Sequence, residues 1–208
     1  MLLSLDSLDA LGIRDKIIVA GGSAGAFSAM QFAIKYPERV SALLLLVPDA
    51  WVPPALRDPA GQDVGGNPFV MKVILKLDFA FWAFIKLAKA EMLSFMGVSK
   101  ELQRSLTPEE NERVTELMDT ILPVSERQAG IVNDEINHRS PERYALENIQ
   151  APTLVIDAAD MDTFGGAKYT AEHIPNARFV AFETGGHLLI GHGQEAKAAV
   201  REFLGTQP

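Results

Sequence analysis

One glycine-rich turn constrains the fold more than any other part of the sequence. The segment Gly21–Gly25 (GGSAG) directly follows Lys16–Ala20 (KIIVA), a short run rich in β-branched residues. After it, apolar residues recur at helical spacing as far as Tyr36, and Pro37 ends the pattern. A strand, a tight turn and a helix in this order predict one unit of an α/β fold.

The rest of the chain extends this α/β pattern and interrupts it once. Residues 42–47 (ALLLLV) are apolar throughout, which is typical of a strand in a parallel sheet that helices cover on both faces. Residues 48–150 instead combine proline- and glycine-rich loops with helical stretches, one of which begins at Thr107-Pro108 as an N-cap and first helical residue. Strand and helix patterns then resume at 153–156, near 170–174, at 178–182 and at 194–204.

These patterns predict an α/β fold with a mostly parallel sheet of four strands flanked by helices. We expect residues 1–47 and 151–208 to form the core of this fold, and residues 48–150 to form an inserted α-helical cap.

Charge and composition exclude several classes of partner. The 208 residues carry 19 Lys and Arg against 27 Asp and Glu, and the net charge of −8 disfavours nucleic acid. The absence of cysteine excludes disulfides, thiolate zinc sites and cysteine nucleophiles. The apolar stretch 69–95 contains too many charges for a membrane span, and the acidic N-terminus lacks the basic region of a signal peptide. We therefore expect a cytoplasmic protein that acts on a small molecule without a cofactor or metal.

The glycine-rich turn also matches G-x-S-x-G, in the strand-to-helix context that gives this motif its meaning. In such a turn Ser23 would stand above the sheet, and the backbone N–H of Ala24 would point to where an oxyanion forms. Glycine at positions 21 and 25 would avoid clashes between the crowded elements. The alternative is a turn that only packs a helix on a strand; a dinucleotide site is disfavoured because G-x-G-x-x-G is absent.

A histidine and a group of acids lie downstream at loop positions. His187 follows two glycines in a loop after a strand, where ligands meet an open α/β sheet, whereas His192 already lies near the last helix. His138 and His173 lie in helical segments, and we interpret them as ordinary surface or core residues. Among the acids after strand 153–156, Asp157 is too close to the strand end, which leaves Asp160 and Asp162 as alternatives.

The chain order of serine, acid and histidine, each after a strand, resembles the α/β-hydrolase superfamily. The resemblance covers almost the whole chain, through residues 20–25 with YPERV at 36–40, APTLVI at 151–156 and IPNA at 174–177 leading to GGH at 185–187. It implies a serine hydrolase of esters or related acyl bonds, with Ser23 as nucleophile, His187 as base and the Ala24 N–H as oxyanion donor. Asp160 is favoured as the acid because 27 residues separate it from His187, against 25 for Asp162. Hydrolysis of a carbon–carbon bond by the same triad is an alternative.

The sequence departs from the family pattern at its N-terminal side. The family's sheet has eight strands and a second oxyanion donor on an early loop, often with a His-Gly pair, and neither fits into the 15 residues before Lys16. We therefore expect an N-terminally truncated fold, with a partner that supplies the missing half as the alternative. Strand 16–20 would be an unprotected edge prone to self-association, and activity would be weak or absent. An inactive remnant that serves as a binding module is the alternative from another class.

Aromatic residues concentrate in the segment expected to form the cap. They could line an apolar substrate pocket over the serine, or they could only hold the cap together. The residues concerned are Phe69, Val70, Phe79, Phe81, Trp82, Phe84 and Phe95.

Overall fold

The computed structural model describes residues 5–53, 76–139 and 142–206 and contains one parallel sheet. Its strands are β1 (Ile17–Ser23), β2 (Val40–Pro48), β3 (Thr153–Ala158) and β4 (Arg178–Phe182). They pair in the order β1-β2-β3-β4, with Val19 opposite Leu43, Leu45 opposite Val155 and Ile156 opposite Val180. The α/β fold class predicted from the sequence is confirmed.

Burial follows each strand's place in the sheet. The two central strands are almost entirely buried, as expected from their continuous apolar runs. Every second residue of β1 is exposed, and the Ile18 side chain is 51% exposed. Within the described residues β1 is therefore an open edge, and self-association through it stays a prediction.

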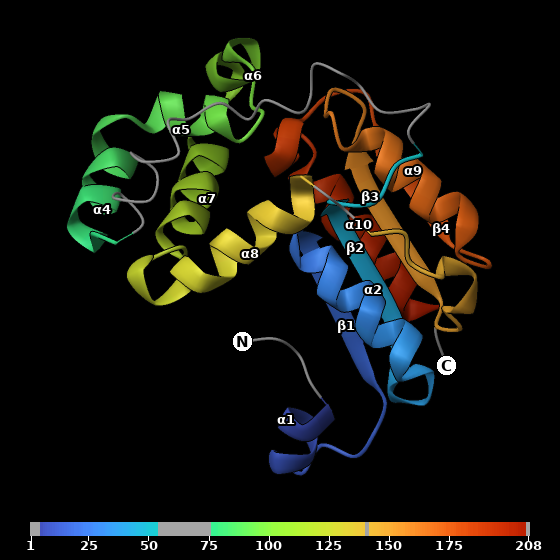
Figure 1. Ribbon diagram of the computed structural model, residues 1–208. Helices are drawn as coiled ribbons and strands as arrows, with labels where there is room; N and C mark the ends of the chain where they lie inside the picture. The colour runs from blue at the N-terminus through green and yellow to red at the C-terminus, as the bar shows by residue number, and fades with distance from the viewer. Residues whose placement is uncertain (1–4, 54–75, 140–141, 207–208) are drawn as a thin grey trace.

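Helices cover both faces of the sheet (Figure 1). On one face lie α2 (Gly25–Lys35) and α9 (Phe164–His173), which form a common core with β1 to β3. Leu8 of α1 (Leu5–Ala10) is buried in the same core. The other face is covered by α10 (Gly193–Gly205), whose Ala199 and Phe203 pack on Leu154 and Ile156.

Five described helices come between β2 and β3 in the sequence. In space they lie to one side of the carboxyl ends of the strands (Figure 1). They are α4 (Asp78–Leu87), α5 (Lys89–Phe95), α6 (Lys100–Ser105), α7 (Pro108–Asp119) and α8 (Gln128–Arg139), and we call them the inserted helices. The predicted start of α7 is confirmed, since Thr107 forms a capping box with Glu110.

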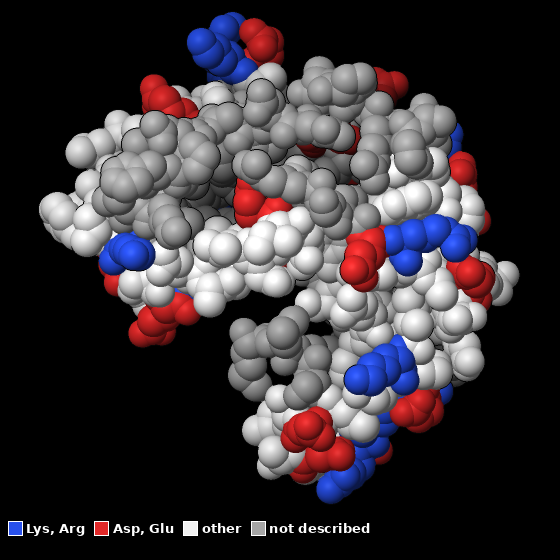
Figure 2. All heavy atoms as spheres, viewed as in Figure 1, with Lys and Arg blue, Asp and Glu red and all other residues white. Residues whose placement is uncertain are grey.

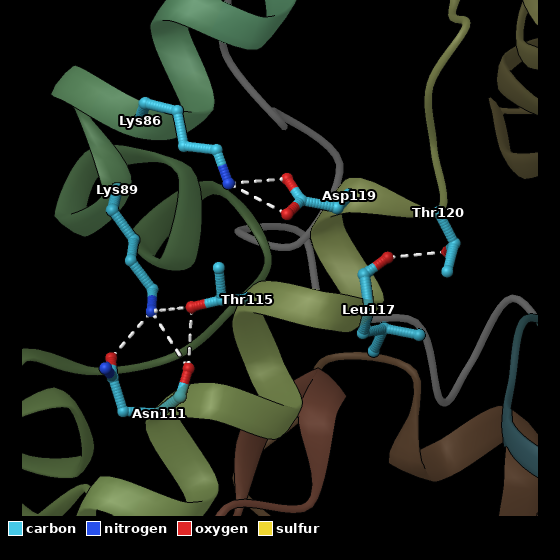
Figure 3. Close-up of polar contacts among 7 residues, drawn as sticks. All are labelled: Lys86, Lys89, Asn111, Thr115, Leu117, Asp119 and Thr120. Atoms are coloured by element: carbon cyan, nitrogen blue, oxygen red, sulfur yellow. Dashed lines mark hydrogen bonds and ion pairs between the residues drawn. The ribbon is translucent and has the colours of Figure 1, made fainter.

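The inserted helices have a hydrophobic core of their own and polar contacts that link one helix to another. Phe81, Ile85, Val114 and Met118 are buried together. At the surface, Lys86 Nζ lies 2.8 Å from both carboxylate oxygens of Asp119, and α7 groups accept hydrogen bonds from Lys89 Nζ (Figure 3). These contacts join α4 and α5 to α7 as one packed layer.

The aromatic residues of this layer do not share one environment. Phe81 is buried and Phe84 packs against the same core, whereas Phe79 and Trp82 stack on each other at the surface, with ring centroids 5.7 Å apart. Phe69 and Val70, as well as the side chain of Phe95, lie outside the described residues. Phe81 and Phe84 therefore serve the packing of the layer itself.

The described surface carries both acidic and basic side chains. On the face drawn in Figure 2, the basic side chains form small separate groups beside acidic ones. None of the helices in the described ranges is long and apolar enough to cross a membrane.

One acidic group lies inside the sheet. Asp157 of β3 is fully buried; one carboxylate oxygen accepts the N–H of Ala158, and the other has no hydrogen-bond partner. Burial raises the pKa of Asp157 to about 7, and the charges of Asp160 and Asp162 act in the same direction.

We predict that Asp157 makes stability fall as the pH rises. Its folded pKa exceeds its ordinary value of 3.8, so its favourable contribution is present below about pH 4 and is lost as the pH rises to about 7. Asp157→Asn should therefore gain on the order of 2 to 4 kcal/mol relative to wild type between pH 4 and pH 8. Urea unfolding at several pH values measures this difference, and a difference that does not change with pH would contradict the prediction.

Candidate active site

Ser23 lies at the end of β1 in a strained backbone conformation. Its φ is +51°, in the left-handed region that residues with a side chain rarely adopt. Ala24 has helical dihedral angles and caps the N-terminus of α2, so the chain turns from strand to helix at the serine. Strain of this kind at a polar residue is typical of functional sites, and the motif G-x-S-x-G needs this geometry.

The two glycines of the motif have different roles. A Cβ at Gly21 would lie 2.7 Å from the carbonyl oxygen of Gly25 and 2.8 Å from Cα of Ala26 and Cβ of Ala29, so only glycine fits there. A Cβ at Gly25 would meet no atom within 4 Å. The expectation that both positions need glycine is therefore right for Gly21 and wrong for Gly25, because only Gly21 lies between β1 and α2.

His187 lies in a short loop directly after two glycines at positive φ. Gly185 has φ +139° and Gly186 has φ +57°, and the 3₁₀ turn η5 (Gly186–Leu188) then carries the histidine. The carboxylate of Asp160 accepts the N–H of Gly185 at 3.1 Å and that of Gly186 at 3.0 Å. Asp160 thus fixes the backbone on which His187 lies.

The electrostatic surroundings of His187 involve other acids. Burial lowers the pKa of His187, while the charges of Asp49 and Asp162 oppose this effect. Asp162 is exposed, and Asp49 follows β2 directly. Of the two acids considered from the sequence, Asp160 therefore holds the loop and Asp162 acts on the ring through its charge.

The remaining histidines have partners of three kinds. His192 pairs with Glu195 and stacks on Phe182, with ring centroids 4.3 Å apart, at the start of α10. His173 stacks on Tyr169 and bonds its carbonyl oxygen. His138 is different, because its Nδ1 lies 2.7 Å from Oδ2 of Asp49, a residue 89 positions away in the sequence. The interpretation of His138 as an ordinary surface or core residue stays a prediction, but its contact with Asp49 was not anticipated from the sequence.

Asp49 is the residue that the sequence analysis missed next to Ser23. Its backbone N–H donates to the carbonyl oxygen of Ser23 at 3.1 Å. A signal was present, since Asp49 directly follows β2 and Ser23 is the last residue of β1, and the carboxyl ends of parallel strands meet at one edge. His138 had no such signal, because it comes from α8 and reaches the site only through the packing of the inserted helices.

The inserted helices also hold the histidine loop. Arg113 of α7 donates to the carbonyl oxygen of Leu188 at 3.0 Å, and Glu110 accepts the N–H of Gly191. A Cβ at Gly186 would lie 2.8 Å from the carbonyl oxygen of Gly97, so the two backbones touch.

The described part of the chain contains no group of three or more His, Asp or Glu side chains that could hold a metal ion.

A parallel sheet with a strained serine between β1 and α2 and a histidine loop after β4 is the arrangement of an α/β hydrolase. The family model for the alpha/beta hydrolase fold matches residues 2–193. The chain therefore belongs to the α/β hydrolase family. No curated protein matches the sequence.

Solved structures agree with this family. A hydrolase from Pseudomonas aeruginosa PA01 is 25% identical, with a TM-score of 0.65 over 97% of this chain and 69% of its own. An alpha/beta hydrolase fold protein from Nakamurella multipartita is 24% identical, with a TM-score of 0.63 over 95% and 72%. An enol-lactonase from Burkholderia xenovorans LB400 is 21% identical, with a TM-score of 0.60 over 97% and 70%. The described fold is thus shared with proteins longer than this chain.

The contrast between the two motif glycines yields a matched pair of variants. Gly21→Ala should lower the free energy of unfolding by about 1 to 3 kcal/mol, because the new methyl group meets backbone atoms that cannot move aside. Gly25→Ala should be neutral or stabilising by up to about 1 kcal/mol, since the position is helical and open. Urea unfolding of both variants measures the difference, and equal stabilities would contradict the packing assigned to Gly21.

Proposed function

We propose that this chain is a serine hydrolase that cleaves an ester or related acyl bond of a small, largely apolar substrate. Ser23 is the nucleophile, His187 the general base and the Ala24 N–H an oxyanion donor. The observation that carries the proposal is the left-handed conformation of Ser23 at the junction of β1 and α2. The hydrolase family and the lactone-cleaving neighbour support the same reaction class.

The lowered pKa of His187 supports its role as a base. A base that accepts the serine proton must be unprotonated near neutral pH, and burial favours that neutral form. In the proposed reaction Asp160 orients His187 by holding Gly185 and Gly186, and Asp162 is the alternative acid. The charges of Asp49 and Asp162 beside the histidine also disfavour an anionic substrate.

The nucleophile is tested with a fluorophosphonate probe and short p-nitrophenyl esters. Wild type should be labelled and should release nitrophenol, whereas Ser23→Ala should show no labelling and at least a ~1000-fold loss of turnover. Ser28→Ala in α2 is the matched control and should be labelled as wild type. Labelling that persists in Ser23→Ala would overturn the assignment of the nucleophile.

The acid is tested by comparing two isosteric variants. Asp160→Asn should lower kcat by about 100-fold or more, because the loop that carries His187 loses its charged acceptor. Asp162→Asn should cost less than about tenfold, since its charge acts from an exposed position. Circular dichroism checks that both variants fold, and the reverse order of effects would assign the acid role to Asp162.

A further inference from the structure

A carboxylate–imidazole pair lies beside the serine turn. At the end of β2 the register shifts by one residue, so that Gly22 pairs with Leu46 and Ser23 with Pro48. The extra residue, Val47, has φ +45°, a rare conformation for a β-branched side chain. This bulge places Asp49 so that its N–H bonds the Ser23 carbonyl oxygen.

The partner of Asp49 comes from the inserted helices. His138 lies near the C-terminal end of α8, and this end lies over the carboxyl ends of β1 and β2 (Figure 1). Its Nδ1 is 2.7 Å from Oδ2 of Asp49, and the two side chains are 28% and 13% exposed. One half of the pair is therefore supplied by the end of a strand and the other half by the inserted helices.

The geometry of this pair is that of an oriented acid–base group. Because Nδ1 bonds the carboxylate, the ring orientation is fixed and Nε2 is left to exchange a proton with a further partner. The charged groups that face His138 are acidic: Asp49 from the end of β2, Asp162 from the loop after β3 and Glu135 from α8 itself. The hydrogen bond to Asp49 raises the pKa of His138, and the opposing effect of burial is smaller.

We propose that Asp49 and His138 form a second acid–base pair of the active site, in which His138 protonates the leaving alcohol. The proposal rests on the serine hydrolase function proposed above and adds a residue to it. In the usual scheme one histidine takes the serine proton and returns it to the leaving group. Here the two tasks are divided between His187 as base and His138 as acid.

The proposed reaction begins with acylation of Ser23. Ser23 Oγ attacks the acyl carbon while its proton passes to His187, and a tetrahedral oxyanion forms. When the oxyanion re-forms the carbonyl bond, the bond from carbon to the leaving oxygen breaks, and its electron pair takes the proton from Nε2 of His138. The alcohol leaves neutral, and the proton on His187 returns to His138 through solvent before water attacks the acyl-enzyme.

A test separates this role from a purely structural link. A nitrophenolate leaves without being protonated, whereas an alkoxide needs a proton. We therefore compare kcat/KM for p-nitrophenyl butyrate and ethyl butyrate in the wild-type chain, in His138→Gln and in Asp49→Asn. His173→Gln is the matched control, because its histidine stacks on Tyr169 within α9.

We expect His138→Gln to lower kcat/KM by about 100-fold for the ethyl ester and by less than about threefold for the nitrophenyl ester. Asp49→Asn should show the same selectivity with a smaller loss, and His173→Gln should show neither. In wild type, kcat/KM for the ethyl ester should fall at high pH as His138 loses its proton, and this limb should be absent in His138→Gln.

Three outcomes would overturn the proposal. An equal loss for both esters would make the pair a structural link between α8 and the sheet. No loss for either ester would remove His138 from the reaction, and wild-type turnover of the nitrophenyl ester alone would show that no group protonates the leaving alcohol. Persistence of both activities in Ser23→Ala would instead refute the serine hydrolase function itself, so the two failures are distinguishable.

Discussion

The close packing of β1 on α2 at Gly21 is the contact on which the site depends. With three atoms within 2.8 Å of where a Cβ would lie, the strand and helix approach as near as the backbone allows. The chain must then reverse within two residues, and Ser23 takes the strained conformation that this requires. The N-cap of α2 is the next residue, Ala24, so one steric constraint sets the position of both the serine and the start of the helix.

The inserted helices stabilise the other side of the site. The histidine loop is held from the sheet by Asp160 and from α7 by Arg113 and Glu110, while Leu188 and Ile190 are buried in the core of the inserted helices. Buried apolar side chains contribute about 1.5 to 3 kcal/mol each, so the loop and these helices are ordered together. Movement of the inserted layer would therefore also move His187.

The fold was more predictable from the sequence than the site. Strands such as 178–182 were placed at their observed bounds, because continuous apolar runs between turn residues are a local signal. The start of α9 at Phe164 was missed, because two adjacent glycines, Gly165 and Gly166, are typical of a loop. In the structure Gly166 lies in the helix, and its lack of a side chain lets the helix backbone approach the carbonyl oxygen of Ala50. The pair of Asp49 and His138 depends on a bulge and on helix packing across 89 positions, and no local pattern encodes either.

The surroundings of His187 and His138 shift the pKa values of the two histidines in opposite directions. His187 lies in a loop packed under the inserted helices, where burial dominates and lowers its pKa, whereas His138 bonds a carboxylate directly and its pKa is raised. In the proposed reaction, these opposite shifts suit His187 to act as the base and His138 as the acid at a single pH. Asp49, at the end of β2, hydrogen-bonds the His138 ring and acts on His187 through its charge, and parallel strands collect such acids at the edge where the serine lies.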